Sequence, residues 1–133
     1  MINFMKQGYK EEEIVKILHP IVKEWFFSKF KSFSLPQTYG VMEVHNRNNI
    51  LISAPTGSGK TLTAFLSVIN ELVNLAEENK LENKVYCVYI SPLKALSNDI
   101  AVNLKKPLRE IMEIAKKEGK DFDIRVGVRT GDT

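Results

Sequence analysis

The sequence contains little cysteine, no long apolar run and only a small excess of one charge. Among 133 residues the single cysteine, Cys87, cannot form an internal disulfide, and its place within an apolar run predicts a small buried hydrophobic residue. Apolar runs such as 85–90 are far too short to cross a bilayer. The first residues also lack the basic, apolar and small-residue segments of a signal peptide. We therefore expect a cytoplasmic protein without a membrane partner.

Charge and histidine content say little about partners. The net charge of +3 and the isoelectric point near 8.9 suit a polyanionic partner, but many proteins without one share these values. His19 and His45 have no cysteine or carboxylate cluster at metal-ligand spacing, which argues against a metal site built on them.

The first third of the chain predicts helices. Acidic residues open one helical pattern, Pro20 opens a second, and a third ends before the turn signal "NRNN" at 46–49. Trp25 and Phe26 lie on the second pattern and are expected in the core. The expected helices span 11–18, 21–30 and 37–45.

From residue 46 the pattern changes to alternating strands and helices. Short β-branched and aromatic runs predict strands that are covered on both faces, and Pro107 is expected to kink or split the last helix. This order is typical of an α/β fold with a parallel sheet, and three strands are fewer than the roughly five of a doubly wound domain. The expected order is strand 50–53, helix 61–76, strand 85–90, helix 93–117 and strand 122–128.

A phosphate-binding pattern lies between the first strand and its helix. Residues 54–61, Ala-Pro-Thr-Gly-Ser-Gly-Lys-Thr, match G-x-x-x-x-G-K-[ST] with alanine at the first glycine position. Glycines free the backbone N–H groups to surround phosphates, a lysine reaches the β- and γ-phosphates, and a hydroxyl binds Mg²⁺. The alternative is a glycine-rich turn with a surface lysine. The predicted ligands of a nucleoside triphosphate are Thr56, Gly57, Ser58, Gly59, Lys60 and Thr61, with Thr61 also the Mg²⁺ ligand.

Three segments together carry a family resemblance. The loop resembles motif I of superfamily 2 helicases, "ISPLKAL" at 90–96 resembles motif Ia, and "FKSFSLPQ" at 30–37 resembles the Q-motif. With "LHPIVKEWFFSKF" and the final "VGVRTGDT", the chain is most similar to the large helicase-related (Lhr-type) subfamily. The resemblance covers 18–133 and implies an incomplete RecA-like domain: N-terminal helices with the Q-motif over 1–45, then a phosphate-loop βαβαβ segment with flanking helices over 46–133.

The resemblance also implies roles for residues outside the loop. Gln37 would hydrogen-bond the adenine edge, because an amide carries both a donor and an acceptor, and Phe30 would pack on its face. Phe30 is equally well explained as a core residue. Contacts to a nucleic-acid backbone are implied for Ser91, Lys94, Thr130 and Gly131, with DNA favoured over RNA.

The acids that hydrolyse ATP are missing from the sequence. No Asp-Glu pair follows an apolar run, although helicases take a Mg²⁺ ligand and a water-positioning glutamate from such a motif. We therefore expect the N-terminal piece of an ATP-dependent helicase that is inactive alone and whose partners are the remaining helicase domains. Two alternatives stay open: a non-catalytic nucleotide- or nucleic-acid-binding module, and an unrelated phosphate-loop enzyme such as a small-molecule kinase.

Overall fold

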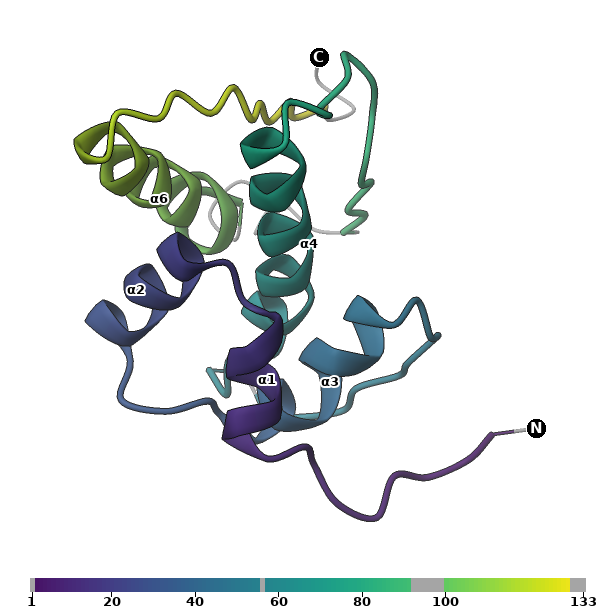
Figure 1. The fold of residues 1–133 in the computed structure, drawn as a ribbon. Coiled ribbons are helices and arrows are strands. Elements are labelled where there is room, and N and C mark those ends of the chain that lie inside the picture. Colours follow the sequence, from purple (N-terminus) through teal and green to yellow (C-terminus); the bar gives the residue numbers. More distant parts are fainter. Residues whose placement is uncertain (1, 56, 92–99, 130–133) are drawn as a thin grey trace.

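The computed structural model describes residues 2–55, 57–91 and 100–129. Figure 1 shows the long helix α4 running through the middle of the molecule, with α2 and α6 beside it and α3 packed against its lower half. The elements are α1 (Glu11–Ile17), α2 (Pro20–Lys29), α3 (Leu35–His45), α4 (Lys60–Glu77), the π-helix η1 (Ala101–Lys105) and α6 (Lys106–Lys117).

The first two helices begin where local chemistry favours a helix start. Three glutamates in the first turn of α1 complement the partial positive charge of the helix N-terminus. Pro20 is the first residue of α2, where its missing N–H costs nothing. His19 caps the same end, because its Nδ1 accepts a hydrogen bond from the Ile21 backbone N–H at 3.0 Å. Both predicted helices are confirmed to within a residue or two.

The remaining helix boundaries also follow the sequence signals. Gly59, at φ +87°, precedes α4, and Gly119, at φ +76°, follows α6; both backbone conformations favour glycine. Pro107 lies in the first turn of α6, directly after the π-helical turn η1. Pro107 was expected to kink or split the last helix; from residue 100 onward the helix instead changes from π to α type just before the proline without a break, because Lys105 and Lys106 both keep helical backbone angles. Residues 93–99 lie outside the described residues.

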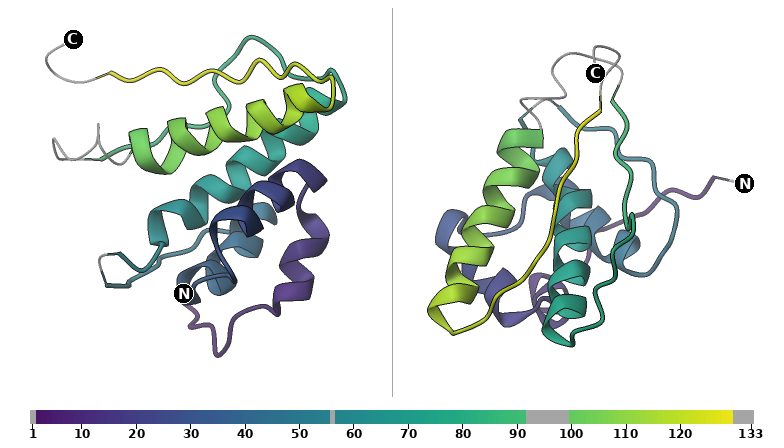
Figure 2. Two further views of the ribbon diagram at one scale, coloured as in Figure 1. Left: turned by 90° about the vertical axis from the view of Figure 1, so that its left-hand side faces the viewer. Right: turned by 90° about the horizontal axis from the view of Figure 1, so that it is seen from above.

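The core joins aromatic residues of α2 to the apolar face of α4. Trp25 and Phe26 are 3% and 0% exposed, as predicted, and the Phe26 ring stacks on Phe33 with centroids 4.5 Å apart. Helix α6 packs against α2 on the same side of α4, and the turn η1 that precedes it contacts α4 (Figure 2). The fully buried apolar side chains that α4 and α6 contribute are Leu66, Ile69, Val73, Ile111 and Ala115.

The predicted parallel sheet is wrong for this structure. Within the described ranges, the three expected strands are extended segments without ladder pairing, so the incomplete RecA-like βαβαβ architecture is not formed. Val85, Val88 and Ile90 of the second segment are 77%, 72% and 84% exposed. An unbroken apolar run indicates burial on both faces only when neighbouring strands and helices are present to cover it.

The separation of these segments gives the physical reason. A strand has no hydrogen-bond partners within itself, so it forms only when a second strand lies about 4.8 Å away. Here side chains from both segments line a cavity of about 580 Å³ between residues 85–91 and 123–129. The third segment is anchored through Phe122 and Ile124, which are 6% and 7% exposed, and the second touches the core through Tyr89, whose ring centroid is 5.0 Å from that of Phe65.

Cys87 is a second correction. Its side chain is exposed on the unpaired segment rather than buried, because nothing among the described residues covers that stretch of chain. Partial desolvation nevertheless raises the pKa of its thiol above the ordinary value. None of the helices described is both long and apolar enough to span a membrane.

Candidate nucleotide and nucleic-acid sites

The predicted phosphate loop adopts backbone conformations that require glycine. Gly57 and Gly59 have φ of +82° and +87°, in the left-handed region that other residues rarely adopt. Ser58 turns back on Pro55, donating hydrogen bonds from both its N–H (3.2 Å) and its Oγ (2.6 Å) to the Pro55 carbonyl. Thr56 lies outside the described residues. Gly57 and Gly59 therefore have the backbone conformation for which a phosphate-binding loop needs glycine.

Lys60 and Thr61 open α4, so the free N–H groups of an 18-residue helix face the loop. The exposed Lys60 side chain bends over the loop, and its Nζ donates to the Ala54 carbonyl at 2.9 Å. A neutral carbonyl is a weak partner that an anionic phosphate can replace. Thr61 is half-buried beside it. Backbone donors, a cation and a hydroxyl thus stand together, a donor set that fits a triphosphate with Mg²⁺.

Gln37 lies against this loop, although it is 22 positions away from Gly59. A Cβ added to Gly59 would stand 3.1 Å from Gln37 Nε2 and 2.9 Å from Ser34 Oγ. Gln37 is 3% exposed, and its Oε1 accepts a hydrogen bond from the Ser34 N–H at 2.8 Å, which orients the amide. Ser34 Oγ is buried without a partner among the described residues. A polar corner therefore adjoins the phosphate loop.

Phe30 lies elsewhere. It directly follows α2, is 42% exposed and contacts the aromatic cluster, with its ring centroid 4.9 Å from that of Phe26 and 6.3 Å from that of Trp25. The described contacts bring Gln37, and not Phe30, to the loop. The core interpretation of Phe30 is thus supported by its neighbours, while its partial exposure leaves one face of the ring open.

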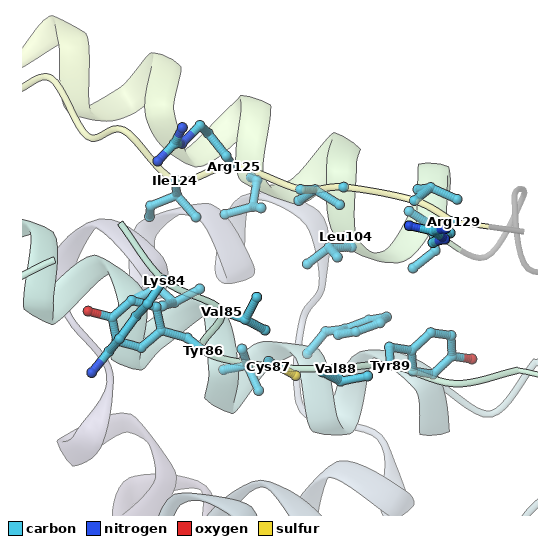
Figure 3. A pocket seen from close by; sticks show the side chains of 18 of the residues that line it. Lys84, Val85, Tyr86, Cys87, Val88, Tyr89, Leu104, Ile124, Arg125 and Arg129 are labelled. Carbon is cyan, nitrogen blue, oxygen red and sulfur yellow. The ribbon is translucent and has the colours of Figure 1, made fainter. Parts of the chain in front are cut away.

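Of the predicted nucleic-acid contacts, the structure describes only Ser91. Lys94, Thr130 and Gly131 fall outside the described residues. Ser91 is half-buried and lines the same cavity as Arg129, the residue just before Thr130. In Figure 3 the two segments run in the same direction, and Tyr89 and Arg129 lie at the same end of the cavity. Ser91 and Arg129, the last described residues of the two segments, therefore line one cavity even without a sheet.

Three candidate residues were missed by sequence reasoning. Arg129 is an exposed cation whose position before Thr-Gly was the available signal. Gly40 and Thr63 connect α3 to α4 below the loop, since a Cβ on Gly40 would approach Thr63 Cγ2 to 2.4 Å. Nothing in a single sequence marks such a contact, because the two residues belong to different elements.

Neither histidine is part of a metal site among the described residues, where three or more potential ligands never gather. His19 is instead structural. Its Nε2 lies 3.2 Å from Glu77 Oε1, and Lys120 Nζ is 2.5 Å from the same oxygen. The hydrogen bond from Lys120, assisted by that from His19, lowers the pKa of the Glu77 carboxyl. This network joins the start of α2 to the end of α4.

Comparison with known proteins gives a consistent result. Residues 34–126 match the DEAD/DEAH box helicase family. The chain is 55% identical to ATP-dependent helicase Lhr-Core of Methanocaldococcus jannaschii and 57% identical to ATP-dependent helicase Lhr-Core protein 2 of Thermococcus barophilus, matching 99% and 100% of this chain. It is 38% identical over 88% of its length to the Lhr helicase/uracil glycosylase of Escherichia coli.

The matched region is a small part of each relative. The chain spans 16% of the length of the two archaeal proteins and 8% of the E. coli protein. No solved structure gives a significant match. The family match excludes an unrelated phosphate-loop kinase, and the Lhr-type resemblance read from the motifs is confirmed by these relatives. Because the match extends from the helix that carries Gln37 to the third extended segment, the chain belongs to the DEAD/DEAH box helicase family.

Proposed function

We propose that this chain is the ATP-binding segment of an ATP-dependent nucleic-acid helicase of the Lhr type. One observation carries the proposal: the Gln37 amide lies against Gly59, beside a loop whose glycines, lysine and threonine open helix α4. A phosphate loop alone serves many enzymes, but a buried amide beside it supplies a means of selecting the base. The three relatives described above are named as ATP-dependent or Lhr helicases, which supports the proposal.

The proposed roles follow from chemistry already described. Loop N–H groups from Thr56 to Lys60 and the N-terminus of α4 hold the phosphates, and the Lys60 ammonium approaches the β- and γ-phosphates. Thr61 supplies a hydroxyl to Mg²⁺, which would neutralise phosphate charge when bound. Gln37 Oε1 keeps one lone pair beyond the Ser34 bond, so the amide can both accept from and donate to adenine.

Nucleic acid is the proposed second ligand, with DNA favoured over RNA. Backbone contacts are assigned to Ser91, Lys94, Thr130 and Gly131, and the position of Arg129 adds a cation at the same end of the cavity. Cations and exposed N–H groups are the groups that hold a phosphate backbone irrespective of sequence. Replacing Arg129 by alanine should weaken binding of single-stranded DNA, while Arg109→Ala, on α6, should leave it unchanged.

Hydrolysis is assigned to residues outside these 133. The sequence has no Asp-Glu motif after an apolar run, so we expect the isolated chain to bind ATP without turning it over, with the remaining helicase domains as its partners. The alternative, a non-catalytic nucleotide- or nucleic-acid-binding module, makes the same binding prediction. DNA-stimulated ATP hydrolysis by the isolated chain would contradict both proposals.

Calorimetric titration with Mg·ATP tests the central proposal. We expect saturable binding that Lys60→Ala weakens by roughly tenfold or more, the effect of losing a charged hydrogen bond to phosphate. Lys80→Ala is the matched control, since Lys80 is an exposed lysine at the far end of α4. Absence of binding by the unaltered chain, or equal losses in both variants, would refute the ATP-binding role.

A further inference from the structure

Three pairs of residues connect the α3 segment to the phosphate loop and α4, and the first pair lies at the loop itself. Gln37 faces Gly59, Gly40 faces Thr63, and Val41 is joined to Ser67. Both sequences advance in the same direction along this contact, in steps of four residues, about one turn, on the α4 side and of three residues and then one on the α3 side. The position of Gln37 relative to the loop therefore depends on the two pairs that follow it.

The first of these pairs is a close approach. A Cβ on Gly40 would stand 2.4 Å from Thr63 Cγ2 and 2.7 Å from Ile52 Cδ1, distances too short for any side chain. Thr63 is itself fully buried, and its Oγ1 donates to the Gly59 carbonyl at 2.9 Å. One side chain thus contacts the last loop residue through its hydroxyl and α3 through its methyl.

The second pair is a buried hydrogen bond. Ser67 Oγ donates to the Val41 carbonyl at 2.6 Å, with Ser67 4% exposed and Val41 fully buried. A donor from one helix to the backbone of another fixes their register along the axis, which apolar packing alone leaves free to slide.

From these contacts we propose that Gly40, Thr63 and Ser67 are positioning residues that set the reach of the Gln37 amide over the loop and so determine selectivity for the nucleotide base. The inference rests on the proposed ATP-binding function. None of the three is among the proposed phosphate ligands. Their loss should therefore change the preference for adenine over guanine while leaving affinity for the phosphate chain nearly constant.

The test compares three probes on one protein: ATP, GTP and inorganic tripolyphosphate, each with Mg²⁺, by equilibrium titration. Gly40→Ala should reduce the ratio of ATP to GTP affinity by roughly tenfold, about the effect of one lost hydrogen bond, with tripolyphosphate affinity unchanged. Adding Thr63→Ser removes the nearer of the two methyls that the new Cβ would meet, and the other, Ile52 Cδ1, ends a side chain that can rotate away, so the double variant should recover most of the preference.

Ser67→Ala provides a test that does not depend on tolerating a larger side chain. It leaves no buried group unpaired, because the Val41 carbonyl keeps its place in the α3 helix, and we expect a loss of preference of roughly threefold. Ser28→Ala is the matched control, since Ser28 Oγ also donates to a backbone carbonyl at 2.6 Å, but within α2. A melting curve for each variant reports folding separately.

The outcomes separate the two proposals. If the unaltered chain fails to bind ATP, the proposed function fails and this inference falls with it. If it binds ATP and GTP equally, or if Gly40→Ala and Ser67→Ala lower affinity for all three probes in parallel, phosphate binding stands and the positioning role is refuted. A selective loss for ATP in both variants, with no change in Ser28→Ala, supports it.

Discussion

The helical part of the molecule and its extended segments are similarly apolar in sequence, but the side chains of the helices are buried and many of those in the extended segments are exposed. Helix α4 buries most of its apolar face, with Leu66, Ile69 and Val73 at 0% exposure. Residues 85–90 are as apolar in sequence, yet Val85 and Ile90 are largely exposed. A helix satisfies its own backbone and needs only one neighbour, whereas a strand needs partners on both edges and cover on its faces. Hydrophobic sequence alone therefore does not secure burial.

The largest expected difference is in side-chain truncation. Phe26→Ala should destabilise the chain by about 3–5 kcal/mol, because the ring is fully buried in the aromatic cluster. Val88→Ala, at 72% exposure, should change the free energy of unfolding by less than about 0.5 kcal/mol. Urea denaturation measures both. A comparable loss of stability in Val88→Ala would show that the extended segment is packed in solution, and the difference between it and the helices would then disappear.

A smaller effect is expected at the junction of α1 and α2. Asn70 uses both ends of its amide there: Oδ1 accepts from the His19 N–H at 2.7 Å and Nδ2 donates to the Ile17 carbonyl at 2.8 Å. Asn70→Ala should cost roughly 2–3 kcal/mol, because buried backbone groups lose their partners. Asn74→Ala, one turn further along α4 and half-buried, should cost less than about 1 kcal/mol. Equal melting temperatures for the two variants would contradict this.

Hydrogen exchange and thiol reactivity can compare the extended segments with helix α4 in the unaltered chain. Amides of 85–91 and 123–129 should exchange close to the rate of an unstructured chain, and those in the middle of α4 only through global unfolding. Cys87 should react with a thiol reagent in the native state, more slowly than a free thiol because its pKa is raised. Protection of these amides together with an unreactive Cys87 would show that the segments are paired.

The smallest effect concerns pH. The hydrogen bond from Lys120 holds the folded-state pKa of Glu77 below its ordinary value of 4.5. A lowered folded pKa means that the contribution to stability is fully present above about pH 4.5 and is lost as pH falls through the folded value. Glu77→Gln should therefore reduce stability slightly at pH 7 and flatten the decline below pH 4.5. Glu113→Gln, on the exposed side of α6, should leave the profile parallel to that of the unaltered chain.

Much of the local structure could be predicted from the sequence because its signals are local. Pro20, Pro107 and Gly119 mark helix boundaries through their own backbone geometry, and the period of apolar residues along α4 identified its buried face. The loop from Ala54 to Thr61 was found for the same reason. The prediction of strands was wrong because a strand forms only beside a partner strand that is distant in the sequence. A short stretch of sequence carries no information about whether that partner is in place.

The candidate site shows the same difference between features that are local in sequence and features that depend on packing. The sequence by itself predicted which groups would bind a nucleotide: the glycines, Lys60, Thr61 and the Gln37 amide. Only the tertiary structure decided that Gln37 reaches Gly59 while Phe30 stays with the aromatic cluster, and that Gly40, Thr63 and Ser67 set that approach. The physical reason is that backbone conformation follows from neighbours along the chain, whereas the distance between two helices follows from the smallest side chains at their contact.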